Sequence, residues 1–232
     1  NNSDNNNNGC NVRNNKDYSN LGDKTYSTSH VSSLPESTQA ALLAILMVGL
    51  SDPHAPTASA VLSLVESRIG VAWTRRHLND TERAEASDLE QEEESRRRGL
   101  EGCGDRGAID AVLVRLASRT PHPFPGRTAF GARRMVTRLL PWLIQPIGKE
   151  LGEWTTEQRK TAARVLFATL VFAEADVSEV LPKIMSLLCA AIGDEDKDVA
   201  LWTLSACHVM GSCVLPKRWL PLVLDHLVAV GG

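Results

Sequence analysis

The sequence predicts an all-α fold in which antiparallel helix pairs stack into a solenoid. Three observations lead to this prediction. The tripeptide Leu181-Pro182-Lys183 returns as Leu215-Pro216-Lys217, 34 residues later. Twice, at Leu140 and at Leu181, a Leu-Pro pair is followed 11 residues on by a Gly-acidic turn, at 151–153 and at 192–194. Aromatic residues are only 5% of the chain, and its abundant Leu, Ala and Val favour helices over a β-sandwich.

Composition bounds the possible classes of protein. The chain has 232 residues, 43% of them apolar, and a net charge of −3, so it has a sizeable core and no basic footprint for nucleic acid. The longest apolar stretch, Ala40 to Leu50, is too short to span a membrane. The five cysteines have no paired spacing, and the first thirty residues do not resemble a signal peptide. We therefore expect reduced thiols and a cytoplasmic location.

The N-terminal half divides into three segments. Residues 1–33 are rich in Asn and Ser and are expected to be disordered. Residues 34–74 predict a helix pair: the first helix follows Leu34-Pro35 and runs to Leu50, and the second spans Thr57–Arg68, with Gly70 expected to end it. Residues 75–130 are charged, then Pro-rich, and predict an insertion or linker, in which 108–119 form a short amphipathic helix or an edge segment.

Residues 131–232 predict the main helical array, whose last repeat is truncated. The expected helices are Arg133–Glu150, one from Thr155 or Thr156 to about Glu174, and then Leu181–Ile192, Lys197–Met210 and Lys217–Val228. Pro141 and Pro146 are expected to bend or break the first of them. Gly152 and Gly193 are placed in the turns between paired helices, where a positive φ would explain why both are glycine.

The interval between repeats separates the possible solenoid types. Helix starts recur after 41 and 34 residues, which suits stacked helical hairpins. The tetratricopeptide pattern of Trp, Gly and Tyr is absent, whereas Pro at the helix starts and the acidic turn GDEDKDV resemble HEAT repeats. A curved surface made by the second helices is expected to bind a protein partner. Its exposed residues would lie within Thr155–Glu174 and Lys197–Met210, and the individual contacts are unknown.

No residue is nominated as catalytic, cofactor-binding or metal-binding. Cys207 and His208 point about 100° apart on a helix, and neither they nor Cys189 and Cys213 form a CxxC pair, which disfavours structural zinc. His122 lies between two prolines without a visible partner, so it forms no nucleophile–base pair.

Two further features carry little chemistry of their own. The Gly-rich stretch 102–107 lacks the Lys-Ser or Lys-Thr ending of a phosphate loop, and nothing marks Ser118 or Cys103 as activated. Tryptophans are the best candidates for binding hot spots where they are exposed, although packing between hairpins explains them as well. They are Trp73, Trp142, Trp154, Trp202 and Trp219.

The order of motifs from about Leu34 to Val228 resembles one family. Its most specific elements are the Pro-rich approach to Gly131-Ala132-Arg133, the Gly-Glu-Trp turn at 152–154 and the helix end at 170–174. The chain is similar in these elements to the HEAT-repeat dynein axonemal assembly factors. The Asn-rich start and the long Arg/Glu insertion depart from that family.

The resemblance implies a non-enzymatic cytoplasmic scaffold. Members of the family preassemble the outer and inner dynein arms of motile cilia and flagella alongside chaperones, so axonemal dynein intermediate or heavy chains are the implied partners. Two alternatives stay open on the sequence. One is a general HEAT-repeat scaffold of the transport or phosphatase type, and the other is the regulatory solenoid arm of a larger enzyme.

Overall fold

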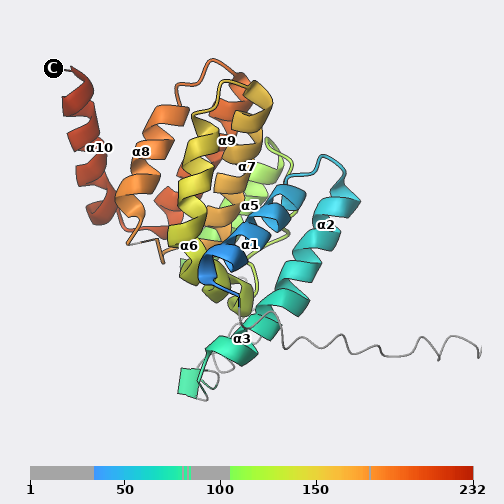
Figure 1. Cartoon of the computed structure of the whole chain (residues 1–232). Coiled ribbons are helices and arrows are strands. Elements are labelled where there is room, and N and C mark those ends of the chain that lie inside the picture. The colour runs from blue at the N-terminus through green and yellow to red at the C-terminus, as the bar shows by residue number, and fades with distance from the viewer. Residues whose placement is uncertain (1–33, 80, 83, 85–104, 178, 232) are drawn as a thin grey trace, which may run out of the picture. The chain divides into compact units, whose positions relative to one another are not determined.

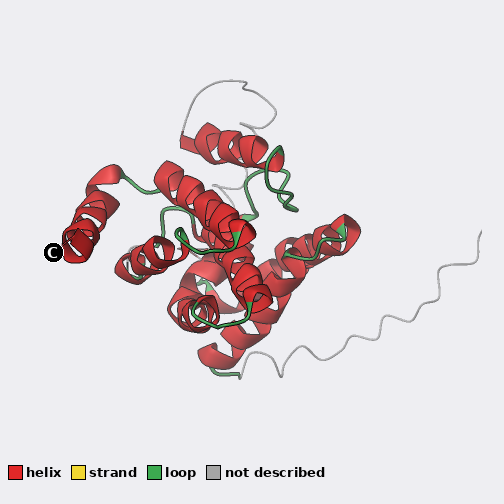
Figure 2. Cartoon of the chain, turned by 90° about the horizontal axis from the view of Figure 1, so that it is seen from above, coloured by secondary structure: helices red, strands yellow, loops and turns green. Residues whose placement is uncertain are grey.

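The computed structural model describes residues 34–79, 81, 82, 84, 105–177 and 179–231. Every regular element within these ranges is a helix, and the helices pack against one another as a HEAT-type solenoid (Figures 1 and 2). The predicted all-α fold class is therefore confirmed. The expected disorder of residues 1–33 lies outside the described residues.

The N-terminal pair begins where the sequence predicts and ends later. Helix α1 spans Glu36–Leu50 and follows Pro35, and α2 spans Ala55–Leu64. The helical path then continues through the π-helical turn η2 (Val65–Gly70) into α3 (Val71–His77). The prediction that Gly70 ends the helix is wrong, because its φ of −60° and ψ of −44° are ordinary helical values.

Gly70 serves a close approach between helices instead. A Cβ atom at Gly70 would lie 2.6 Å from the backbone nitrogen of Ala132, and one at Gly131 would lie 2.8 Å from the carbonyl oxygen of Gly70. Both distances are too short for real side chains, so η2 and α6 touch backbone to backbone at these two glycines. This contact fixes the first pair against the main array.

The central pair consists of α6 (Phe130–Leu151) and α7 (Thr156–Ala173). Helix α6 runs without interruption through Pro141 and Pro146, so the expected break does not occur. Both prolines lie on the exposed side of the helix, where water can satisfy the carbonyl groups left without a donor. Leu140-Pro141 is therefore the middle of a helix and not its start.

The same motif does mark helix starts in the later repeats. Helix α8 (Leu181–Ala191) has Pro182 in its first turn, and α10 (Pro216–Gly231) begins at Pro216. Between them, α9 (Lys197–Cys213) is capped by Asp196, whose side chain accepts hydrogen bonds from the backbone nitrogens of Asp198 and Val199. The acidic turn thus starts the second helix of its pair.

The helices stack in two rows. First helices α6, α8 and α10 lie side by side across Figure 1, and second helices α7 and α9 pack against each other behind them. Helix α1 packs on both α6 and α7, so the N-terminal pair extends the stack. The core lies between the rows and is mainly aliphatic, with fully buried Leu139, Leu143, Leu166, Leu170 and Ile184, and it also contains the fully buried rings of Phe167 and Phe172.

The turns between paired helices do not need glycine. Gly152 has a φ of −88°, and none of the glycines in the described residues has a positive φ. A Cβ at Gly193 would meet nothing within 4 Å. The prediction that both positions require a positive φ is therefore wrong, because each turn closes with ordinary right-handed geometry.

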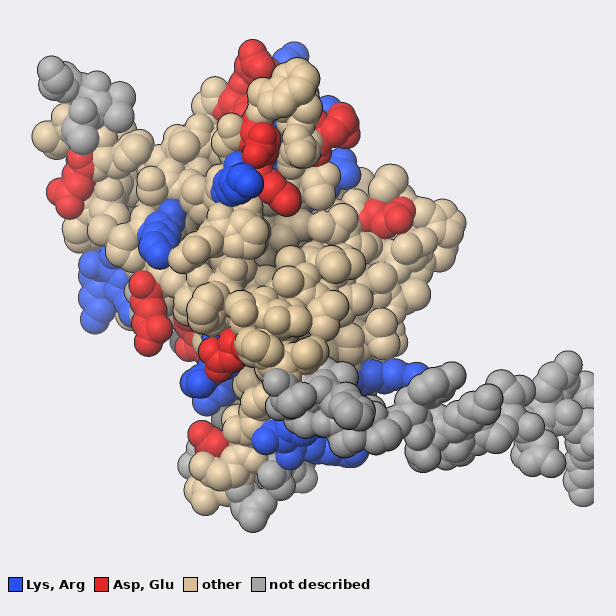
Figure 3. Space-filling model, viewed as in Figure 1, with Lys and Arg blue, Asp and Glu red and all other residues tan. Residues whose placement is uncertain are grey.

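Ion pairs connect successive turns at one end of the stack. Arg159 of α7 is almost buried and donates from Nε and Nη2 to the two carboxylate oxygens of Asp194, at 2.8 and 3.1 Å. The Arg159 guanidinium holds the pKa of Asp194 below its usual range. Figure 3 shows the acidic side chains that gather at this end, with Lys and Arg among them. This link fixes the spacing of two neighbouring repeats.

Candidate protein-interaction surface

Helix α7 offers almost no free surface. From Ala162 to Ala173 each of its residues is buried except Arg164, which is half-buried, and only Glu157 and Gln158 in its first turn are exposed. Helix α9 keeps a few exposed residues, among them Leu201 and Leu204. The expectation of a broad binding surface on the second helices therefore fails for α7.

The chain itself covers this face. Helix α5 (Asp105–Ala117) packs against α9, and the extended stretch after it crosses both second helices. We call residues 105–129 the cover. Ile109, Val112, Leu113 and Leu116 of α5 are all buried, so the short amphipathic helix expected within 108–119 is present and docked. The wider boundaries of the expected insertion, 75–130, stay a prediction.

Two side chains of the Pro-rich stretch anchor the cover. Phe124 is buried, with its ring edge-on to Phe172 at 5.6 Å and to Phe167 at 6.1 Å. His122 lies beside them and is hydrogen-bonded through Nε2 to the carbonyl oxygen of Leu113 at 3.0 Å. Sequence reasoning missed this partner, because it is a backbone carbonyl of the preceding helix, nine residues away.

A charged clamp holds the end of the cover. Arg127 donates from Nε and Nη2 to the two carboxylate oxygens of Glu174, at 2.7 and 2.5 Å. Glu174 caps α7 with a φ of 48° and a ψ of −120°, a conformation that costs a side-chain-bearing residue about 1–3 kcal/mol. The Arg127 backbone nitrogen is fixed in turn by Asp110 at 2.7 Å. The bidentate pair therefore offsets local backbone strain.

His122 should make the stability of the cover depend on pH. Burial lowers the pKa of His122 below its ordinary 6.5, and its Nδ1 accepts a hydrogen bond from the backbone nitrogen of Phe124. The stability contributed by the neutral ring is fully present above pH 6.5 and is lost as the pH falls through the folded-state pKa. We expect the free energy of unfolding to fall between pH 7.5 and pH 5, and to fall less in His122→Asn. Equal pH slopes for the two proteins would contradict the buried neutral ring.

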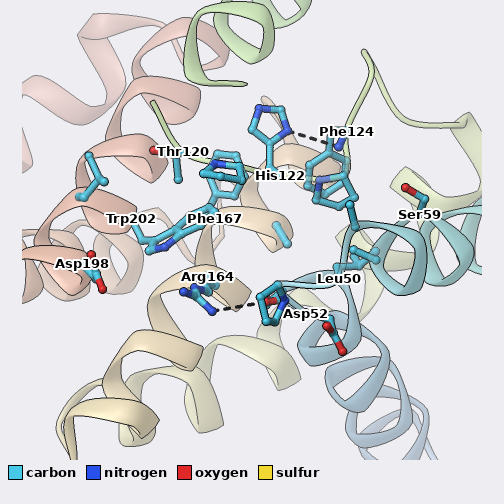
Figure 4. A pocket seen from close by; sticks show the side chains of 18 of the residues that line it. Leu50, Asp52, Ser59, Thr120, His122, Phe124, Arg164, Phe167, Asp198 and Trp202 are labelled. Carbon is cyan, nitrogen blue, oxygen red and sulfur yellow. Dashed lines mark hydrogen bonds between the residues drawn. The ribbon is translucent and has the colours of Figure 1, made fainter. Parts of the chain in front are cut away.

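A pocket of about 440 Å³ remains open beside the cover (Figure 4). The α1–α2 turn forms one wall, the 119–124 stretch a second, and α7 with the N-terminal half of α9 the third. Its apolar lining includes Phe167 and Trp202, and the guanidinium of Arg164 lies over the Trp202 ring at 5.5 Å. Its size and its few convergent polar groups suit the binding of a ligand.

The five tryptophans separate into two classes. Trp202 is buried, and Trp73 and Trp219 are half-buried, with the Trp219 indole donating to the carbonyl oxygen of Val214. Trp142 is 48% exposed on α6, and Trp154 is 86% exposed in the α6–α7 turn. Only these last two meet the condition of exposure for a binding hot spot.

The cysteines are placed as buried thiols. Cys189, Cys207 and Cys213 are free and half-buried, and burial raises the pKa of Cys207 to about 11 and that of Cys213 to about 12. Thiols with such pKa values are poor nucleophiles and poor metal ligands at neutral pH. Within the described ranges there is no group of three or more His, Cys, Asp or Glu side chains that could hold a metal ion. Cys103 and most of the Gly-rich stretch lie outside those ranges.

Comparison with known proteins agrees with this architecture. A family model for the HEAT-repeat domain of dynein axonemal assembly factor 5 matches residues 121–230. These residues are similar to that HEAT-repeat family. The match begins within the Pro-rich stretch of the cover and ends in α10, so the His122 and Phe124 anchors and the Arg127 clamp fall inside the matched region.

Individual relatives carry the same name. The chain is 30% identical over 115 residues to dynein axonemal assembly factor 5 of Mus musculus, which is 48% of this chain and 14% of the relative. It is 27% identical over 109 residues to the protein of that name from Homo sapiens, and this alignment covers 46% of this chain and 13% of the relative. The matched part thus spans about one eighth of the relatives' length. No solved structure gives a significant match to the HEAT-repeat chain.

The lengths and hydropathies of the helices bear on whether the chain could span a membrane. Among the helices in the described ranges, none is both long enough and apolar enough to cross a bilayer.

Proposed function

We propose that this protein is a non-enzymatic scaffold that acts in the cytoplasm to preassemble the dynein arms of motile cilia and flagella. The observation that carries the proposal is the match of residues 121–230 to the HEAT-repeat domain of dynein axonemal assembly factor 5. The names of the relatives from mouse, human and Xenopus laevis support the same role.

The physical basis is the exposed surface that unassembled motor subunits present. Large multi-subunit proteins expose apolar patches before their partners bind, and such patches aggregate. A helical solenoid can cover a long surface with a row of side chains. In this chain, α1 contributes exposed Leu42, Ile45 and Val48 at helical spacing, and the nearby face of the stack carries few charges (Figure 3).

Protein partners follow from this role. We propose axonemal dynein intermediate or heavy chains as clients, with chaperones acting on the same complexes. Trp154 is the strongest single contact candidate, because an indole exposed at 86% carries a large apolar area into solvent.

Recovery of newly made dynein subunits from cytosol tests the proposal. The tagged protein is purified from the cytosol of cells that are building motile cilia, and dynein intermediate and heavy chains are quantified by mass spectrometry. We expect enrichment over an untagged control and a severalfold loss in Trp154→Ala, with the half-buried Trp73→Phe as matched control. Background levels of both chains would overturn the dynein proposal in favour of a general HEAT-repeat scaffold.

A further inference from the structure

Arg164 is exceptional among the cations that are not exposed. Within the described ranges, five Lys or Arg residues are buried or half-buried, and four of them have a carboxylate oxygen within 4.0 Å. The four paired residues are Arg127, Arg133, Arg159 and Lys160. Arg164 has no such pair. Desolvated cations are normally paired, so a half-buried guanidinium without a carboxylate marks a position where one is missing.

The hydrogen bonding of Arg164 is also incomplete. Its Nη1 donates to the carbonyl oxygen of Ser51 at a long 3.4 Å, and its Nε is shielded from solvent without any acceptor. The cost of leaving a shielded donor unpaired is about 1–3 kcal/mol. Figure 4 shows the Arg164 side chain reaching into the pocket between the α1–α2 turn and Trp202. An oxygen supplied from within the pocket would pair with the Nη end of the guanidinium, which carries the same charge.

Of the two acidic residues that line the pocket, only Asp198 is paired with a cation. Asp198 lies 3.4 Å from Lys160 Nζ, and Asp52 accepts a hydrogen bond from the backbone nitrogen of His54 at 2.7 Å. Arg119 also lines the pocket, is exposed, and within the described part of the chain is a second guanidinium without a carboxylate partner. Within the described residues, two guanidiniums without a carboxylate (Arg164 and Arg119) and one carboxylate without a cation (Asp52) line the pocket. Its unpaired charge is therefore net positive, and it lies next to apolar walls.

We infer that the pocket binds a polypeptide segment in which an Asp or Glu stands next to a bulky apolar residue. The carboxylate would pair with the Nη groups of Arg164, while the apolar side chain would pack against the exposed lining residues Pro53, Pro121 and Leu201. Arginine presents a planar fork that matches a carboxylate, which gives the site its selectivity. The inference deepens the proposed scaffold role and rests on it only in taking the ligand to be a protein.

Selection from a random peptide display library tests this site on the purified chain. We expect the wild-type protein to enrich peptides that carry an acidic residue beside a bulky apolar one. A synthetic enriched peptide should bind at least tenfold more tightly than its counterpart with Asn or Gln in place of the acid, as measured by calorimetry. Arg164→Met should lose at least tenfold in affinity, and Arg164→Glu should enrich Lys or Arg instead.

Controls keep the result interpretable. Lys149→Met removes an exposed cation of α6 that does not line the pocket, and its affinity should equal that of the wild type. Arg164→Lys keeps the charge without the fork and should give intermediate affinity, and helical circular dichroism must be retained in every variant compared. Enrichment of neutral or basic peptides, no enrichment over an unrelated protein, or unchanged affinity in Arg164→Met would each overturn the inference. Because no dynein is used, such a failure leaves the dynein-arm proposal to its own test.

Discussion

Replacing Phe124 by alanine should lower the free energy of unfolding by about 3–5 kcal/mol, the range found for buried Phe→Ala changes. Phe124 is only 5% exposed and packs from the cover onto α7, edge-on to Phe167 and Phe172. The change removes a whole ring from a closed apolar site and also removes two favourable aromatic contacts. The free energy is measured by urea unfolding, followed by circular dichroism at 222 nm.

The matched control for Phe124→Ala is a truncation on the exposed side of the same segment. Val114 on α5 is 68% exposed, so Val114→Ala should change the free energy by less than about 0.5 kcal/mol. Trypsin should also cut Phe124→Ala after Arg119 or Arg127 sooner than it cuts the wild type. If the two variants were equally stable and equally resistant, residues 118–129 would be the undocked linker that their proline content suggests.

Replacing Gly70 by valine should destabilise the protein by about 3 kcal/mol, at the upper end of the usual cost of overpacking. The first added atom would lie 2.6 Å from the backbone nitrogen of Ala132, and neither backbone can move without separating η2 from α6. A β-branched side chain also has no rotamer that avoids the opposing helix. Thermal unfolding of the purified variant measures the effect.

Gly193→Val is the matched control for the glycine contact. A Cβ atom at Gly193 would have open space around it, and Gly193 has no positive φ. The melting temperature of the Gly193→Val protein should therefore stay within a few degrees of that of the wild type. If Gly70→Val and Gly193→Val lowered the melting temperature by similar amounts, the backbone-to-backbone contact of Gly70 with Gly131 would not be the reason that position 70 requires glycine.

The sequence was most informative where one local rule acts alone. Leu-Pro at Leu181 and Leu215 marks helix starts, because proline lacks the N–H that a first turn leaves unpaired anyway. The same pair at Leu140 misleads, because α6 places Pro141 on its exposed side and continues. Hydrophobic periodicity cannot distinguish a proline at a helix start from one inside a helix, since the difference depends on which residues surround the proline ring in the folded protein.

The candidate site was beyond sequence reasoning for a different reason. The cover docks through contacts between residues far apart in the chain, such as Arg127 with Glu174 and Thr120 with Ser205. A Pro-rich segment after a charged run has the composition of a linker, and only the partners on α7 and α9 show that it is folded. The unpaired state of Arg164 is likewise visible only once every nearby carboxylate has been located.

The role in dynein arm assembly is tested most directly by electron tomography of axonemes from motile ciliated cells that lack the protein. The result we predict is complete microtubule doublets without outer and inner dynein arms, restored by the wild-type protein. Arms of normal number and normal motility after complete loss would contradict the role.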